Sequence, residues 1–480
     1  MSDSSTEQKV LDVLILAAGL GTRMKSDIAK VLHRLDGRPL INHVCQAATA
    51  LAPQSIYVVV GHQEEEVKAA VLSELDEQKV VFVTQEKQLG TGDAVNSARQ
   101  YLQNKDSTLL VLSGDVPMIR PETLAALIQQ HYRHNDVGAA CTILTVKLND
   151  STGYGRIVRG DTGLFERIVE QKDATDDEKQ ISEINAGIYC FDSRQLYSAL
   201  SAVKNHNSQG EYYLTDVPAL LRDAGEEVVI FQYNDPHEIE GINNRVQLAD
   251  LERILRRRTI SKLMLDQGVT FIDPKNAYVS AQATIGRDTV IYPNVTIEGA
   301  TEIGERCIIR PGTRLTNAKI GHHVEIRDNC FITDSEIADD CTVGPMAHLR
   351  GNAKMETNSK VGNFVELKKT KLGRGSKASH LTYLGDATIG EETNIGAGVI
   401  TCNYDGKNKH ETLIGDRVKI GSDTMLVAPV KVGDGAVTGA GSVVTKDVEA
   451  DTLVVGAPAR KIKNLTESIK TAAKTTELGS

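Results

Sequence analysis

A glycine-rich turn followed by three basic residues lies close to the N-terminus. The apolar run 10–16, which we expect to be a buried strand, leads directly into Ala17-Ala18-Gly19-Leu20-Gly21-Thr22. Backbone N–H groups in such a turn can approach phosphates or a base, and Arg23, Lys25 and Lys30 add positive charge nearby. The third glycine of a dinucleotide fingerprint is missing. The pattern therefore favours a nucleotide loop that binds neither nicotinamide nor flavin cofactors, with an ordinary strand-to-helix turn as the alternative.

Asp115 is the carboxylate with the best position for a metal ion in this half of the chain. It follows the apolar run 109–112 in the sequence Ser113-Gly114-Asp115-Val116-Pro117. A carboxylate beside a nucleotide phosphate can hold Mg²⁺, which needs only one or two protein oxygens. A turn residue that closes a strand is the alternative, and the spacing by itself leaves both open.

His380 is the side chain in the second half that could act as a base. It lies in residues 375–386, which interrupt a pattern in which aliphatic residues recur at every sixth position. A second polar interruption of this pattern covers residues 401–410. Function often resides in irregular polar insertions on a regular scaffold. A histidine that is neutral near pH 7 can remove a proton from an amine that attacks a thioester. A solvated loop histidine is the alternative.

Strands and helices alternate through the first half of the chain. The expected strands are 10–16, 56–60, 80–84 and 109–112, and the expected helices are 43–51, 64–72, 93–101 and 121–131. This alternation predicts a mostly parallel, Rossmann-like α/β sheet with helices on both faces. Ligands bind at the carboxyl ends of such strands, where Gly19, Gln85, Gly90 and Asp115 would lie.

Aliphatic residues recur at every sixth position over much of the second half. The first of them are Ile285, Ile291, Ile297, Ile303, Ile309 and Leu315. A period of six is typical of a parallel β-helix with one hexad per face and three faces per turn. Glycine often follows the aliphatic residue, and we expect it to adopt positive φ there. The narrow interior suits a chain with 4% aromatic residues and no Trp. Small inward positions hold Cys307, Cys330 and Cys341, which we interpret as packing residues.

Bulk properties exclude several classes of function. The net charge of −10 argues against nucleic acid as a partner, and no apolar run is long enough for a membrane span. The polar N-terminus lacks the apolar core of a signal peptide. Seven cysteines are scattered without CxxC spacing, which suggests reduced thiols and a cytoplasmic protein.

Motifs in both halves together resemble one enzyme family. The nucleotide loop, with Lys30-Val31-Leu32 after it, is similar to the signature of sugar-phosphate nucleotidyltransferases. Further motifs narrow the resemblance: Gln85 with Leu89-Gly90-Thr91-Gly92, Gly153-Tyr154-Gly155-Arg156, and Gly241-Ile242-Asn243-Asn244-Arg245. Over nearly the whole chain, they look like the bifunctional N-acetylglucosamine-1-phosphate uridyltransferase/glucosamine-1-phosphate acetyltransferase family.

This resemblance implies an architecture and two reactions. The β-helix would be left-handed, and the protein would be a homotrimer with acetyl sites between neighbouring β-helices. The C-terminal half would acetylate glucosamine-1-phosphate with acetyl-CoA. The N-terminal half would then transfer UMP from UTP to the product with Mg²⁺, releasing pyrophosphate. The product, UDP-N-acetylglucosamine, would serve the synthesis of peptidoglycan and lipopolysaccharide.

The resemblance also implies a set of site residues. In the N-terminal half, the nucleotide and sugar would be bound by Leu16, Ala17, Ala18, Gly19, Lys30, Gln85, Gly90, Thr91, Gly155, Glu170, Asn185 and Asn243. Arg23 and Lys30 would be the catalytic cations, and Asp115 and Asn243 would bind Mg²⁺. In the C-terminal half, His380 would be the general base. The glucosamine-1-phosphate would be held by Arg350, Lys368, Tyr383 and Asn394, and acetyl-CoA by Ala397, Asn403, Tyr404, Ser422 and Ala440.

Three positions depart from the family pattern. Ala29 replaces a usual proline and Ser113 a usual tyrosine, and neither change removes a charged group. Ala457 stands where an arginine would meet a phosphate of coenzyme A. We hypothesise that this charge comes from one or more of the basic residues that follow, Arg460, Lys461 and Lys463. A solvated basic tail is the alternative.

We expect four segments along the chain. They are a uridyltransferase domain at 1–245, an amphipathic linker helix at 246–267, a β-helix acetyltransferase domain at 268–460 and a tail at 461–480. Two other functions are alternatives: a single-activity sugar-phosphate nucleotidyltransferase with a regulatory β-helix, and a non-catalytic assembly subunit. The polar segments around His380 and Asn403 argue against the first. Retention of the charged residues in the nucleotide site argues against the second.

Overall fold

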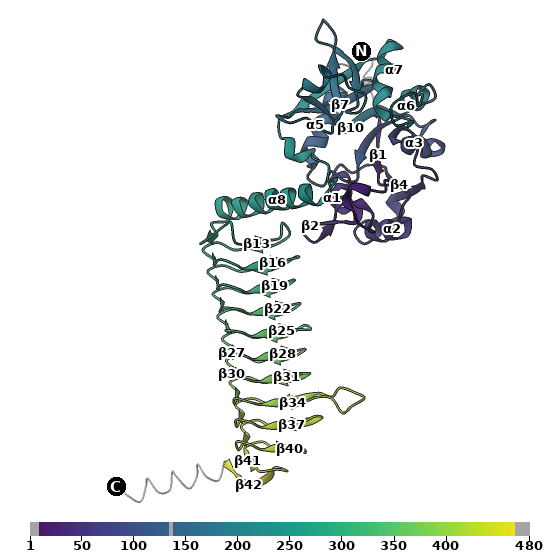
Figure 1. The fold of residues 1–480 in the computed structure, drawn as a ribbon. Coiled ribbons are helices and arrows are strands. Elements are labelled where there is room, and N and C mark those ends of the chain that lie inside the picture. Colours follow the sequence, from purple (N-terminus) through teal and green to yellow (C-terminus); the bar gives the residue numbers. More distant parts are fainter. Residues whose placement is uncertain (1–8, 134–137, 466–480) are drawn as a thin grey trace, which may run out of the picture. The chain divides into compact units, whose positions relative to one another are not determined.

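The structure is a computed structural model of the chain that describes residues 9–133 and 138–465. It divides into two compact units, Met1–Arg253 and Ile254–Ser480. The boundary falls within helix α8 (Arg245–Asp266), which occupies the segment where the amphipathic pattern predicts a linker helix (Figure 1). No helix in the described part of the chain is long and apolar enough to cross a lipid bilayer.

A mixed sheet forms the centre of the first unit, with the strand order β11-β7-β10-β6-β1-β4-β5. Strand β1 (Val10–Leu16) is parallel to both of its neighbours. The other strands of this run are β4 (Ser55–Val60), β5 (Val80–Thr84), β6 (Ser107–Ser113), β7 (Cys141–Lys147), β10 (Glu183–Asp192) and β11 (Val228–Tyr233). Strand β10 is antiparallel to β6 and β7, and the hairpin of β8 (Arg156–Arg159) and β9 (Phe165–Val169) pairs beside it. The four predicted strands therefore form the parallel half of the sheet.

Helices cover both faces of this sheet because its strands are apolar on both sides. Along β1, Val13 and Ile15 belong to one buried cluster, whereas Leu14 belongs to the cluster on the opposite face. The helices are α1 (Leu40–Thr49), α2 (Glu64–Leu72), α3 (Thr91–Ser97), α4 (Arg99–Leu102), α5 (Pro121–His131), α6 (Ser193–Leu200) and α7 (Val217–Asp223). The predicted helix 93–101 is two helices that meet at Ala98, and the prediction for α2 and α5 is confirmed to the residue.

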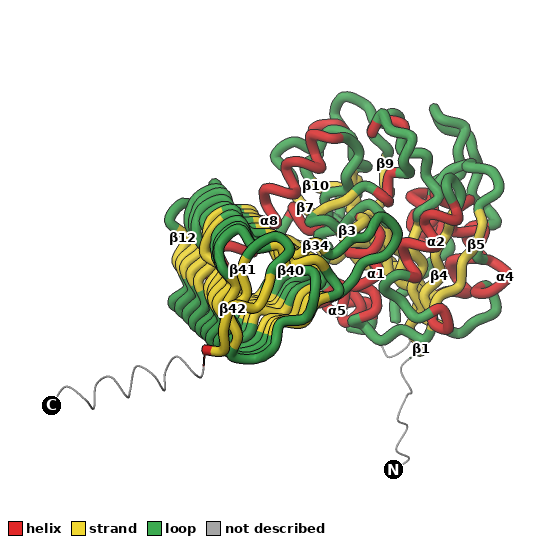
Figure 2. The backbone as a smooth tube through the Cα atoms, turned by 90° about the horizontal axis from the view of Figure 1, so that it is seen from below, coloured by secondary structure: helices red, strands yellow, loops and turns green. Residues whose placement is uncertain are grey.

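The second unit is a left-handed parallel β-helix whose three walls are sheets of parallel strands, apart from the antiparallel strand β42 at the end of the first wall (Figures 1 and 2). The first wall consists of β12 (Thr270–Phe271), β15 (Val290–Ile291), β18 (Ile308–Ile309), β21 (Glu325–Ile326), β24 (Thr342–Val343), β27 (Lys360–Asn363), β30 (Lys377–His380), β33 (Asn394–Ile395), β36 (Lys419–Ile420), β39 (Val437–Thr438), β41 (Thr452–Val455) and β42 (Arg460–Asn464). The second wall consists of β13 (Tyr278–Val279), β16 (Thr296–Glu298), β19 (Arg314–Thr316), β22 (Phe331–Thr333), β25 (His348–Arg350), β28 (Glu366–Lys368), β31 (Tyr383–Gly385), β34 (Ile400–Cys402), β37 (Met425–Val427) and β40 (Val443–Val444). The third wall consists of β14 (Thr284–Ile285), β17 (Glu302–Ile303), β20 (Lys319–Ile320), β23 (Glu336–Ile337), β26 (Lys354–Met355), β29 (Lys371–Leu372), β32 (Ala387–Ile389), β35 (Thr412–Ile414) and β38 (Val430–Val432).

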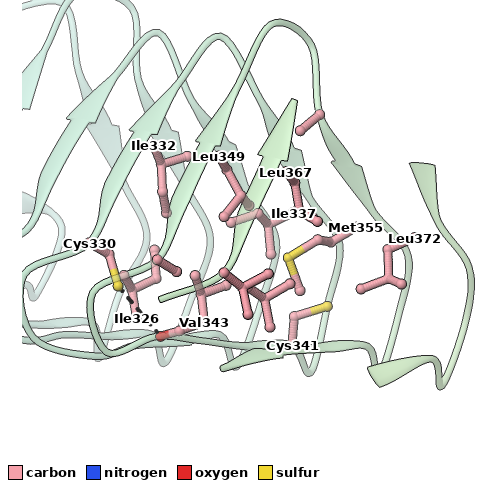
Figure 3. Packing of buried hydrophobic residues seen from close by; sticks show 14 of the residues in the cluster. Ile326, Cys330, Ile332, Ile337, Cys341, Val343, Leu349, Met355, Leu367 and Leu372 are labelled. Carbon is pink, nitrogen blue, oxygen red and sulfur yellow. Dashed lines mark hydrogen bonds between the residues drawn. The ribbon is translucent and has the colours of Figure 1, made fainter. Parts of the chain in front are cut away.

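Aliphatic residues of the hexads stack in register inside this prism. Ile291 pairs with Ile309, for example, and both are fully buried. Figure 3 shows the same packing lower in the stack, where the thiol of Cys330 lies 3.8 Å from the carbonyl oxygen of Val343. Cys307, Cys330 and Cys341 are all buried, so their interpretation as packing residues is confirmed.

Most glycines that follow the aliphatic residues do not have the positive φ expected for them, although Gly344, after Val343, has a φ of 95°. Close approach of the next coil explains them instead: a Cβ on Gly286 would lie 2.7 Å from the carbonyl carbon of Gly304, and Gly421 is similarly crowded. Corner residues with positive φ are often Asn or Asp, such as Asn294 and Asn329.

The segment 375–386 corrects the prediction of an irregular insertion. It forms regular coil through β30 and β31, and His380 ends β30 opposite Asn363 of the coil before. Ala378 occupies the inward position of its hexad, where a larger aliphatic residue is usual, so the six-residue pattern is not visible in the sequence there. The second predicted interruption is real, because residues 403–411 leave the prism between β34 and β35 with a bridge from Tyr404 to Lys409.

The β-helix continues beyond the expected boundary at residue 460. Strand β42 runs antiparallel to β41 and includes three of the basic residues singled out above, Arg460, Lys461 and Lys463. The rest of the predicted tail, residues 466–480, lies outside the described residues.

Candidate active sites

The nucleotide loop lines a cavity of about 470 Å³ at the carboxyl ends of β1, β5 and β6. The cavity brings together the predicted residues Leu16, Ala17, Ala18, Gly19, Lys30, Gln85, Gly90, Thr91 and Asp115. Gln88 also lines it and was missed by sequence reasoning. Its side-chain amide donates a hydrogen bond to the carbonyl oxygen of Ala18 at 2.7 Å, which holds the loop in place.

Two glycines of the cavity are required by their surroundings. Gly21 has a φ of 64°, and a Cβ there would lie 2.5 Å from the Cβ of Lys30. Gly90 has a φ of 113°, and a Cβ there would lie 2.5 Å from the carbonyl oxygen of Tyr212. A side chain at either position would displace Lys30 or the backbone at Tyr212, so both positions require glycine.

Lys30 lies between two oxygen-bearing side chains. Its ammonium forms an ion pair with Oδ2 of Asp115 and lies 3.3 Å from Oδ1 of Asn243. Arg23 donates to the same Asn243 oxygen at 2.8 Å, and Ser113 donates to Oδ1 of Asp115 at 2.6 Å. Burial by itself would raise the pKa of Asp115, but the adjacent Lys30 outweighs burial and lowers it. Asp115 is therefore an ionised carboxylate at neutral pH.

The oxygens of Asp115 and Asn243 fit the requirements of Mg²⁺. Both are hard donors, and the Lys30 ammonium already contacts both, so the two side chains accommodate a cation between them. Mg²⁺ completes its coordination with water and substrate phosphates rather than with a full set of protein ligands. Within residues 9–133 and 138–465, no group of three or more His, Cys, Asp or Glu side chains could hold a metal ion by itself.

The three predicted sugar-binding residues lie together beside the β8–β9 hairpin. The backbone N–H of Asn185 donates to the carbonyl oxygen of Gly155 at 2.9 Å. A Cβ on Gly155 would lie 3.6 Å from a carboxylate oxygen of Glu170 and 3.7 Å from the Cβ of Asn185. Burial raises the pKa of Glu170, whose carboxylate accepts a hydrogen bond from Thr215 at 3.1 Å.

Tyr154 is a polar residue of this region that sequence reasoning missed. Burial raises the pKa of its hydroxyl to about 12, with the negative charges of Glu240 and Asp115 acting in the same direction. The hydroxyl also bonds to the backbone of Gly241. Tyr154 therefore links the start of the β8–β9 hairpin to the segment that carries Asn243. The sequence motif contains Tyr154, but the family resemblance implies a role in sugar binding for Gly155 and not for the tyrosine.

His380 is exposed at the end of β30, and its ring is held from the preceding coil. Nδ1 lies 2.8 Å from Oδ1 of Asn363. An amide oxygen can only accept, so Nδ1 is the donor and Nε2 carries the lone pair of the neutral ring. Asn363 was missed because its partner is one full coil away in the sequence.

Cations gather at one edge of the second wall. Arg350 and Lys368 are register partners at the ends of β25 and β28. Lys368 lies 3.3 Å from Asp386, and Arg350 donates to Glu366 at 2.7 Å. The nearby Lys368 ammonium lowers the pKa of Lys409. Lys409, which sequence reasoning missed, therefore brings a third basic side chain from the insertion to this edge.

Tyr383 and Asn403 converge near these cations. A Cβ on Gly385 would lie 2.4 Å from the hydroxyl oxygen of Tyr383 and 2.7 Å from Nδ2 of Asn403. Tyr404 is exposed, and its hydroxyl donates within the insertion to the Gly406 carbonyl at 2.6 Å. Asn394 begins β33 on the first wall, so within one chain it does not join Arg350, Lys368 and Tyr383 on the second wall.

Five residues occupy the same corner position in successive coils of the first wall. They are Asn363, His380, Ala397, Ser422 and Ala440, and we call them the corner column. Backbone bonds tie the coils together here: the N–H after Ser422 donates to the carbonyl of Ala397 at 2.7 Å, and the N–H after Ala440 donates to that of Ser422 at 2.8 Å. Below His380 the column carries only small side chains, so an extended ligand could lie along it.

Comparisons with known proteins match both units. The MobA-like NTP transferase domain matches residues 13–148, the GMPPB C-terminal domain matches residues 272–355, and the bacterial transferase hexapeptide matches residues 411–446. These matches and the observed strands confirm the predicted fold class.

Whole-length relatives extend the comparison. The "Bifunctional protein GlmU" of Syntrophomonas wolfei is 48% identical over 445 residues, covering 93% of this chain and 97% of the relative. The proteins of that name from Heliobacterium modesticaldum and Geobacillus thermodenitrificans are 50% and 48% identical, covering 94% and 92% of this chain and 96% and 94% of the relatives. The name of these relatives agrees with the predicted two-activity enzyme. The chain belongs to the bifunctional GlmU family.

Proposed function

We propose that the chain carries one transferase site in each unit and that the two reactions together make UDP-N-acetylglucosamine. The C-terminal unit acetylates glucosamine-1-phosphate with acetyl-CoA. The N-terminal unit then joins the product to UMP from UTP and releases pyrophosphate. Two features carry this proposal: the cluster of Arg23, Lys30, Asp115 and Asn243 beside the nucleotide cavity, and the corner column that begins at His380.

In uridyl transfer, a phosphate oxygen of the sugar phosphate attacks the α-phosphorus of UTP and the bond to pyrophosphate breaks. Arg23 and Lys30 neutralise charge on the triphosphate, which is the main contribution a protein can make to such a transfer. The backbone from Ala17 to Gly19 and the side chain of Gln85 hold the base. Gly155, Glu170 and Asn185 hold the sugar, whose phosphate then faces the nucleotide.

Asp115 and Asn243 would hold Mg²⁺ in this site. A bound Mg²⁺ supplies shielding of phosphate charge and support for the leaving pyrophosphate. Lys30, which contacts both of these side chains, would then be available to bind the phosphates of UTP.

In acetyl transfer, the amine of glucosamine-1-phosphate attacks the thioester carbonyl of acetyl-CoA. Nε2 of His380 accepts the proton that the amine loses, and the coenzyme A thiolate leaves. The Asn363 hydrogen bond keeps the ring in the tautomer with its lone pair on Nε2. Arg350 and Lys368, joined by Lys409, hold the sugar phosphate.

Coenzyme A would lie along the lower part of the corner column. Ala397, Ser422 and Ala440 present small side chains over three successive coils, which leaves room for an extended chain. Asn403 and Tyr404 would contact it from the insertion. Tyr383 and Asn394 would orient the sugar.

A homotrimer would complete the acetyl site. Within one chain, Asn394 lies on a different wall from Arg350, Lys368 and Tyr383, so a neighbouring copy is the simplest way to bring the two sets together. The insertion at residues 403–411 projects from the prism and could reach such a neighbour (Figure 1). A reducing, cytoplasmic setting suits the seven cysteines, which are all free.

One assay tests the two reactions together. The purified chain is incubated with UTP, Mg²⁺, acetyl-CoA and glucosamine-1-phosphate, and products are read by mass spectrometry. We expect UDP-N-acetylglucosamine, coenzyme A and pyrophosphate. A chain that turned over only pre-acetylated sugar phosphate would be the single-activity alternative with a regulatory β-helix. Light scattering of the same sample measures whether it is a trimer.

A further inference from the structure

An ion pair between a buried carboxylate, Glu238, and a half-exposed arginine, Arg120, joins the two segments that carry Asp115 and Asn243. Glu238 ends the short helix η6 (Pro236–Glu238), shortly before Asn243, and its side chain is 0% exposed. Arg120 lies shortly after Asp115, immediately before α5. Its guanidinium forms an ion pair and a hydrogen bond with Oε1 of Glu238.

Further bonds fix the Glu238 carboxylate. Thr123, in the first turn of α5, donates to Oε2 at 2.5 Å, and the Tyr233 hydroxyl donates to Oε1 at 3.1 Å. Arg120 also donates to the Tyr233 hydroxyl at 3.2 Å. Both carboxylate oxygens therefore have partners, and the ions hold each other in one geometry. Loss of Arg120 would leave the buried Glu238 carboxylate without its cationic partner, whereas Arg120 is half exposed and also lies 3.7 Å from a carboxylate oxygen of Asp235.

The same two segments meet again at the candidate metal ligands. The backbone N–H of Ile242 donates to the carbonyl oxygen of Asp115 at 2.9 Å. Gly241 lies against the Asp115 carboxylate, since a Cβ there would be 3.4 Å from Oδ2. The segments are thus joined at two points, one at the ligands and one at the Arg120–Glu238 pair. With the second point removed, the Asn243 segment could pivot about the first.

We propose that Glu238, acting through Arg120, is a positioning residue for the metal and triphosphate site of the N-terminal unit. It reaches neither substrate nor metal, and it sets where Oδ1 of Asn243 stands relative to the Asp115 carboxylate. The inference rests on the proposed uridyltransferase function. Groups that orient metal ligands from behind commonly change metal affinity by about 10- to 100-fold when they are lost.

The test is Glu238→Gln in the full chain, a change that keeps the side-chain volume and removes the charge. Electron paramagnetic resonance measures Mn²⁺ binding in the presence of UTP and without sugar phosphate, so no turnover occurs. We expect the Mn²⁺ dissociation constant to rise about 10-fold. Uridyl transfer should need correspondingly more Mg²⁺ for half-maximal rate, and acetyl transfer should keep its wild-type rate.

Glu183→Gln is the matched control. Glu183 is also a buried carboxylate held by an arginine and a threonine, Arg159 at 2.8 Å and Thr145 at 2.8 Å, but it lies on β10 and not on either ligand segment. It should lose stability without changing Mn²⁺ affinity. Arg120→Lys, which keeps the charge, should stay within about threefold of the wild type, whereas Arg120→Met should resemble Glu238→Gln.

The outcomes separate the possible failures. If folded Glu238→Gln melts at a lower temperature but binds Mn²⁺ as the wild type does, Glu238 is merely structural and the inference is wrong. If Glu238→Gln does not fold, Arg120→Met decides by the same criterion. If the wild type with UTP binds no Mn²⁺, the metal site of the proposed function fails instead.

Discussion

Asn363→Ala should slow acetyl transfer by a small and calculable factor. Asn363 acts on the reaction through one 2.8 Å hydrogen bond to Nδ1 of His380. The net contribution of such a bond is about 0.5–1.5 kcal/mol, and about 1.36 kcal/mol corresponds to a tenfold change in rate. We therefore expect kcat for acetyl transfer to fall about 2- to 13-fold. His380→Ala, which removes the base itself, should cost about 10²- to 10⁴-fold.

Asn363→Asp should change the pH dependence of the same reaction. A carboxylate beside Nδ1 favours the protonated imidazole over the neutral ring. Because His380 must be neutral to accept a proton, the acidic limb of the profile of kcat/KM against pH should move to higher pH. Near the upper plateau the variant should be nearly as fast as the wild type.

Chromatographic measurement of coenzyme A release gives both results. Uridyl transfer from pre-acetylated sugar phosphate, measured on the same samples, is the control and should be unchanged. A full wild-type rate for Asn363→Ala, with an unshifted pH profile for Asn363→Asp, would refute the role of this hydrogen bond in orienting the base. Equal loss of both activities would refute the separation of the two sites.

Three further predictions concern metal, assembly and coenzyme. Asp115→Ala should cripple uridyl transfer alone, because developing phosphate charge needs Mg²⁺ and thioester aminolysis does not; a chelator that stopped acetyl transfer with equal potency would contradict this. A fragment that ends at Arg257 should be a monomeric uridyltransferase by light scattering, since it lacks the walls of the β-helix, and a trimeric fragment would show that assembly resides elsewhere. Replacing Arg460, Lys461 and Lys463 together by Ala should raise KM for acetyl-CoA several-fold at low salt and less at high salt, because exposed ion pairs contribute only about 0.2–1 kcal/mol each. Lys461 already pairs with Glu449 at 2.5 Å, so most of the effect should come from Arg460 and Lys463. An unchanged KM for acetyl-CoA at low salt would exclude a contact of all three residues with coenzyme A.

The β-helix was predictable because its pattern is local and repeated. Each hexad places one aliphatic residue inward, and the register of Ile291 with Ile309 follows from spacing alone. The same logic failed at residues 375–386, because Ala378 contributes too little apolar volume to mark its hexad. The expected reason for the glycines after the aliphatic residues, a positive φ, was wrong at Gly286. There the neighbouring coil leaves no room for a side chain.

The sites were less accessible to sequence reasoning, since their parts meet only after folding. The loop at Gly19 and the carboxylate of Asp115 end adjacent parallel strands, so strand order brings them together. The partnership of Lys368 with Lys409 depends on how the insertion folds back, and that of His380 with Asn363 depends on the length of a coil. No local spacing encodes either contact.

The corner column has a consequence for how far a ligand can reach. Its members are spaced by the distance between adjacent strands, about 4.8 Å. The corner from His380 to Ala440 is therefore about 14 Å long, in three equal steps. Because each coil contacts only its neighbours, a whole coil could be inserted between Ala397 and Ser422 without disturbing the rest. Such an insertion would lengthen the corner column by one strand spacing and leave His380 in place. Coil number would then select acyl donors by the length of the arm that carries the thioester.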